Sequence, residues 1–129
     1  MATIKEAYVS VDIEQLLRDK GFDVPIRTFF NIRKDNSIRY NSCKIDHNAN
    51  CNHLSCPTQQ MVMAWLTAVK GIVIEIRVRH NTGLNGLPLF EYQYCIYNGM
   101  DKHLDRAHFF EKREACIDEA IRYCLENLI

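Results

Sequence analysis

The strongest hydrophobic pattern covers residues 56–79, where an apolar helix pattern is followed at once by the alternating pattern of a strand. Between residues 61 and 69 only Thr67 is polar, so the predicted helix is apolar almost all round and must be covered on more than one side. The Lys-Gly pair at residues 70–71 predicts the end of this helix. The alternation that follows predicts a strand with one buried face. Its apolar residues are Ile72, Ile74, Ile76 and Val78.

Weaker patterns of the same kind predict the remaining elements. Residues 10–19 predict an amphipathic helix that buries Ile13 and Leu17 and carries Glu14 on its polar face. The alternating stretches on either side of turn residues predict strands. In chain order, we expect a helix at 10–19, strands at 26–32 and 38–40, a helix at 57–69, strands at 72–79 and 89–97, a short strand at 107–110, and a helix from residue 112 to the C-terminus.

This order, α-β-β-α-β-β-(β)-α, predicts an α+β fold in which three helices cover an antiparallel sheet. The two halves echo each other, because LLRDKGFDVPIRTFF and WLTAVKGIVIEIRV both run from a helix through Lys-Gly into a strand. An internal duplication of a helix-hairpin unit is one explanation of the echo. The other is that many unrelated helices end at a Lys-Gly pair.

Length and composition predict one globular domain over residues 1–129, with residues 1–9 as a tail and residues 41–56 as a Cys/His-containing loop. Lys plus Arg equals Asp plus Glu at 16 each, so the net charge offers no general attraction for nucleic acid or an anionic membrane. No segment approaches the roughly 18 apolar residues of a membrane span, and no secretion signal precedes the domain. We therefore expect a cytoplasmic protein, with its six cysteines reduced and no membrane contact.

Three segments together resemble a group of small proteins of unknown function from gut Bacteroidetes, several of them associated with mobile elements or phages. These segments are KGFDVP after the first helix, CPTQQMVMAWL at the second, and EACIDEAIRYCLENLI at the end. The resemblance covers most of residues 8–129 and implies no activity or catalytic residue. The chain departs from that group at Thr67 and Ala68, where charged residues are usual, and in a loop richer in Cys and His.

That loop contains five potential metal ligands within fourteen residues: Cys43, His47, Cys51, His53 and Cys56. A structural zinc site needs four Cys or His ligands at short spacings, so the four-ligand candidate is Cys43, His47, Cys51 and Cys56, with His53 as a spare. The alternative is an Asn-rich loop without any cofactor, in which the histidines are solvated. An enzymatic version would use a loop cysteine paired with His47 or His53 as nucleophile and base. No oxyanion hole or phosphate-binding motif accompanies the pair, so we predict a protein that is not an enzyme.

Arg77 and Arg79 lie on the polar face of the strand that follows the apolar helix. Beside the arginines of the earlier strand pair, they would form a basic stripe that contacts phosphates in a nucleic acid. The alternative is that they pair with Glu75 or Glu91 across the sheet. The earlier arginines are Arg27, Arg33 and Arg39.

The apolar helix has more apolar side chains than one small sheet can cover. Met61, Met63 and Trp65 are therefore candidates for an interface with a protein partner or a second copy, since Met and Trp are favoured at interfaces. The alternative is complete burial within the domain, and in both cases Trp65 should be buried. The sequence thus predicts a small non-enzymatic binding or accessory protein. A zinc-stabilised nucleic-acid-binding module is the second hypothesis, and an enzyme with a loop cysteine is the third.

Overall fold

The structure of the chain is a computed structural model, and it describes residues 7–31, 37–46, 48, 53–55 and 57–129. The fold is α+β with three helices, as predicted. The described strands form two antiparallel sheets of three, in the orders β2-β1-β3 and β4-β5-β6. The elements are α1 (Val11–Asp19), β1 (Ile26–Asn31), β2 (Ser37–Ile45), β3 (His53–Ser55), α2 (Gln59–Lys70), β4 (Ile72–Thr82), β5 (Pro88–Asn98), β6 (Asp101–Asp105) and α3 (Arg113–Asn127).

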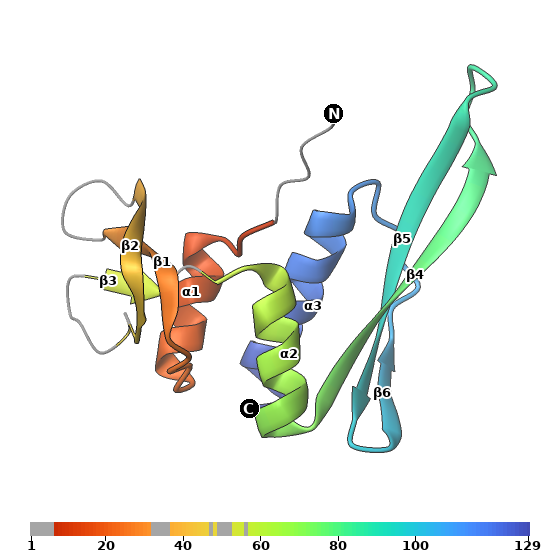
Figure 1. Cartoon of the computed structure of the whole chain (residues 1–129). Helices are drawn as coiled ribbons and strands as arrows, with labels where there is room; N and C mark the ends of the chain where they lie inside the picture. Colours follow the sequence, from red (N-terminus) through yellow and green to blue (C-terminus); the bar gives the residue numbers. More distant parts are fainter. Residues whose placement is uncertain (1–6, 32–36, 47, 49–52, 56) are drawn as a thin grey trace.

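The helices lie between the two sheets (Figure 1), and α3 is the central element because it packs against α1, α2, β4 and β5. The apolar helix α2 packs against β4 and α3, but its Met61 and Val69 side chains stay exposed. The core therefore centres on the last helix of the chain rather than on the most apolar one. The buried residues of α3 are Cys116, Ile117, Ala120, Ile121, Cys124 and Leu125.

Local signals set both ends of α2. The Thr58 side chain accepts a hydrogen bond of 3.2 Å from the backbone N–H of Met61, so Thr58 caps the helix and satisfies a donor that has no partner within the helix. Gly71 ends the helix with φ at 69°, a left-handed conformation that glycine adopts without a steric penalty. The chain then enters β4 directly, as the Lys-Gly pair predicts.

Two predicted boundaries are wrong. The predicted loop at 41–56 begins too early, because β2 continues to Ile45, and His53–Ser55 form β3. Pairing with β1 holds these polar segments in the first sheet, and such pairing overrides the weak strand propensity of Asn and Ser. The third strand of the second sheet is Asp101–Asp105 rather than 107–110, since the Asn98-Gly99 turn returns the chain at once. Phe110 forms an isolated bridge with Tyr92.

The two halves share an order of one helix followed by three strands, but their sheets are built differently. The first strand, β1, is central in the first sheet, whereas the second strand, β5, is central in the second sheet. The echo in sequence therefore extends to the order of elements and not to the order of strands within the sheets.

The hairpin of β4 and β5 extends well beyond the helices (Figure 1). The two strands pair along their full length, from Ile72 opposite Asn98 to Thr82 opposite Pro88. Burial falls along this hairpin, because Ile74 is buried whereas Val78, on the same face of β4, is 52% exposed. We call residues 78–92 the projecting hairpin.

Candidate protein-binding surfaces

The predicted metal ligands are not brought together by the described part of the chain. His47, Cys51 and Cys56 lie outside the described residues, so the four-ligand set stays a prediction. Cys43 is in the part of β2 beside the start of β1, whereas His53 of β3 pairs with Asn31 at its other end. About four residues of strand, roughly 13 Å, separate those two positions along the sheet. Among the described residues no group of three metal-ligating side chains occurs.

The arginines on the outer face of β4 are paired with carboxylates. Arg77 Nε donates a hydrogen bond of 2.9 Å to Oε1 of Glu75, and its Nη1 lies 3.5 Å from Oδ1 of Asp105. Arg79 donates to Oε2 of Glu91, the residue opposite it on β5. The predicted alternative of a pair across the sheet therefore holds for Arg79 with Glu91, whereas Arg77 pairs with Glu75 along its own strand. This face carries mixed charge rather than the open basic stripe that phosphate binding requires.

Trp65 is 6% exposed, which confirms the prediction that it is buried. Its ring meets the ring of Phe22 edge to face, with 5.3 Å between the centroids. The ammonium of Lys70 lies 5.8 Å from the centroid of the Trp65 ring. Burial is thus achieved inside the domain, by the segment that follows α1, and not by a second copy.

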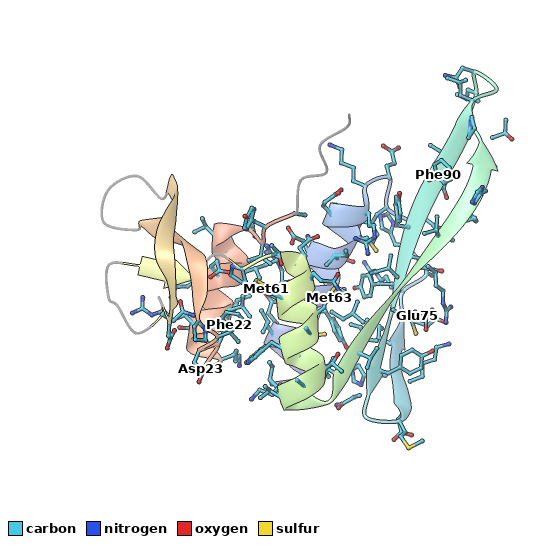
Figure 2. All side chains as sticks on the ribbon, in the orientation of Figure 1. Phe22, Asp23, Met61, Met63, Glu75 and Phe90 are labelled. Atoms are coloured by element: carbon cyan, nitrogen blue, oxygen red, sulfur yellow. The ribbon has the colours of Figure 1, made fainter. Side chains whose placement is uncertain are left out.

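The two methionines of the predicted interface leave α2 on different sides (Figure 2). Met63 packs against the core, whereas Met61 remains 38% exposed and Val69 60% exposed. Met61 belongs to an apolar groove with a cavity of about 370 Å³, and the side chain of Trp65 contributes to its wall. We call this surface the α2 groove. It is lined by Val24, Met61, Ala64, Trp65, Ala68 and Val69.

A polar cleft of about 300 Å³ lies between β5 and α3, and the sequence patterns gave no sign of it. Burial and a hydrogen bond to Glu119 raise the pKa of Tyr94, and Arg106 Nε lies 3.6 Å from Oε2 of Glu119. The Tyr123 hydroxyl and Nε2 of His103 are hydrogen bonded at 3.0 Å. In this cleft Arg106 and Glu119 face one another, which is typical of a polar contact that joins a helix to a sheet.

Glu14 contradicts the prediction that it lies on the polar face of the first helix. It is fully buried, and neither carboxyl oxygen has a hydrogen-bond partner among the described residues. Burial raises the pKa of Glu14 to about 9. Contacts with both α3 and β3 narrow the exposed face of α1, on which Asp12, Gln15 and Asp19 remain, and no local pattern indicates this double cover.

The projecting hairpin is a further apolar surface that sequence patterns did not single out. Phe90 lies on its far half (Figure 2) and is 45% exposed. The rings of His80 and Phe90, opposite one another on the two strands, meet edge to face at 4.8 Å. Val78 and Phe90 are thus apolar residues at the end of a sheet face that the helices cover only as far as its buried half.

No helix in the described residues is long and apolar enough to cross a membrane. No family model matches the sequence, and neither a curated protein nor a solved structure matches it. The resemblance to the Bacteroidetes proteins therefore stays an expectation from sequence.

Proposed function

We propose that this chain is a small non-enzymatic binding or accessory protein that acts through protein-protein contacts made by the α2 groove. The observation that carries the proposal is the row of apolar side chains on the exposed side of α2. Met61, Ala64 and Ala68 follow one another at helical spacing on this side, and Trp65 lies between them. An exposed apolar groove of this kind is typical of a surface that binds another protein.

The groove has the features of an adaptable binding site. Ala64 and Ala68 are small, so they leave a hollow between the longer side chains of Met61 and Val69. The Met61 thioether can take several rotamers and so adjust to different apolar groups. Trp65 is held by Phe22 and provides a rigid wall that needs no reordering on binding. These features favour a partner segment that presents a row of apolar side chains, such as one face of an amphipathic helix.

Nucleic-acid binding is less well supported. Arg77 and Arg79 already contact the carboxylates of Glu75, Asp105 and Glu91, so a phosphate would have to displace them. The α2 groove needs no such displacement. The paired arginines of β4 and the open α2 groove therefore both favour a protein partner over a nucleic acid.

The test is affinity capture from extracts of the source cell with quantitative mass spectrometry, comparing the wild type with Ala64→Glu. Ala64 is exposed, so glutamate should be tolerated by the helix while placing a charge in the groove. The matched control is Ala115→Glu, because Ala115 is also an exposed helical alanine but lies on α3, outside the groove.

A protein that is captured by the wild type and by Ala115→Glu, and lost with Ala64→Glu, would support the proposal. Equal capture of every protein by all three variants would refute it. Circular dichroism and urea unfolding should show that all three variants are folded.

A further inference from the structure

β4 is an edge strand with an open side. It pairs with β5 on one side, and no described strand pairs with its other side. It is eleven residues long. Proteins usually keep their edge strands short to prevent association with other chains, and β4 is much longer than such strands. It carries no proline, so every residue keeps its backbone N–H, although the Ile72 carbonyl already accepts a hydrogen bond of 2.9 Å from the Thr67 hydroxyl.

The apolar face of this strand is also incompletely covered. Ile72 and Ile74 are buried under the helices, whereas Val78 is half exposed in the projecting hairpin. A hairpin of two strands is at best marginally stable in water unless another strand or a helix covers it. Within the described part of one copy, Phe110 pairs with Tyr92 and Phe109 lies against Arg79 at the base of the projecting hairpin, while Val78 and Phe90 stay half exposed.

We propose that two copies of the chain associate through their β4 edges, antiparallel and about a twofold axis at Ile76, to form one continuous six-stranded sheet. A second copy is the partner that fits, because the charges of β4 are complementary to β4 itself in this register. In an antiparallel pair related by a twofold axis, residues at equal distances on either side of the central residue lie opposite one another. Ile76 at the centre places Glu75 of each copy opposite Arg77 of the other.

The neighbouring registers are disfavoured by charge. A centre at Arg77 places the two Arg77 side chains opposite one another, and a centre at Glu75 does the same for the two carboxylates. A centre at Val78 places Arg77 opposite Arg79 twice. Like charges directly opposite one another destabilise a sheet. The centre at Arg77 also brings Glu75 opposite Arg79, so among these four registers only the centre at Ile76 pairs opposite charges without pairing like charges.

The same register covers the apolar face. Ile76 of one copy lies opposite Ile76 of the other, and the half-exposed Val78 lies opposite the buried Ile74. Each projecting hairpin then runs beside the part of the other sheet that the helices cover. The Glu75 and Arg77 side chains are paired with each other in one copy but remain 45% and 40% exposed, so a second chain can reach them and extend this ion pair across the two strands.

The experiment is sedimentation of Glu75→Arg, Arg77→Glu and the double variant beside the wild type. The wild type should be a dimer, and each single variant should have a dissociation constant higher by on the order of tenfold or more, because two attractive pairs become repulsive. The double variant restores opposite charges and should again be a dimer. An equimolar mixture of the two single variants should form a mixed dimer, since both cross-strand pairs between residues 75 and 77 are then of opposite charge.

Two control variants distinguish dimerisation through β4 from binding at the α2 groove and from a general effect of net charge. Ala64→Glu should remain a dimer, because the α2 groove contains no residue of β4, so each surface can fail without the other. Glu111→Arg, an exposed position outside β4, controls for net charge and should not change the dimer. A wild type that is a monomer at every concentration would overturn the proposal. Single variants that dimerise as well as the wild type, or a mixture that does not associate, would overturn it too.

Discussion

Replacing Glu14 by glutamine should remove most of the pH dependence of stability between pH 5 and pH 8. Glu14 is fully buried in α1, and neither oxygen of its carboxyl is hydrogen bonded to a described residue. Its pKa is raised by burial from the ordinary value of 4.5 to about 9. The carboxyl is therefore neutral in the folded protein and ionised in the unfolded chain at neutral pH.

The sign follows from proton binding. Between pH 4.5 and pH 9 the folded state holds one proton more than the unfolded state at Glu14, so the stability falls as the pH rises. The slope is about 1.4 kcal/mol per pH unit. The 2.5 pH units between 4.5 and 7 then correspond to a loss of about 3 kcal/mol at pH 7, relative to a chain with a permanently neutral side chain at this position.

Urea unfolding at pH 5 and pH 8 measures this effect. The wild type should lose about 4 kcal/mol from Glu14 across these three pH units. Glu14→Gln keeps the shape of the neutral carboxyl and should lack this loss, so the variant should be the more stable protein at pH 8. Glu126→Gln, at an exposed position of α3, is the matched control and should follow the wild type. The reasoning would be refuted if Glu14→Gln and the wild type lost the same stability between the two pH values.

Three further substitutions or reactions test the packing. Trp65→Ala should lower the free energy of unfolding by about 3 to 5 kcal/mol, measured in urea, because it leaves a cavity beside Phe22. Thr58→Ala should cost about 1 kcal/mol through the lost cap of α2, whereas Thr58→Ser should cost less because it keeps the hydroxyl. Burial raises the pKa of Cys116 to about 11 and that of Cys124 to about 12. Peptide mapping after iodoacetamide treatment at pH 8 should therefore find both unmodified in the native protein and modified in urea.

The parts of the fold that the sequence predicted best are those set by local signals. The end of α2 at Gly71 and the alternation of β4 both follow from residues that are adjacent in the chain. The partner of Arg79 is different, because Glu91 is opposite it only in the register of β4 with β5. From the sequence, the ion pair between Arg79 and Glu91 is one of two alternatives. The register of β4 with β5 decides between them.

The burial of Glu14 illustrates what local patterns miss. Its polarity places it on the outer face of an amphipathic helix, and nothing nearby in the sequence contradicts that assignment. Contacts of α1 with α3 and β3, both distant in the sequence, narrow the outer face to a strip that excludes Glu14. The α2 groove shows the opposite case, since apolar residues that sequence patterns would bury remain exposed where no element covers them.

The lengths of the elements explain why the second sheet has an uncovered end. α3 has 15 residues and is about 22 Å long, since each residue of a helix adds about 1.5 Å. β4 has 11 residues and is about 36 Å long at about 3.3 Å per residue. Even aligned along the strand, α3 would leave about 14 Å of β4 uncovered, which is about four residues. The alternating pattern of β4 shows no break at the point where the cover ends, so it describes equally a face buried by a helix and a face that a second chain would bury.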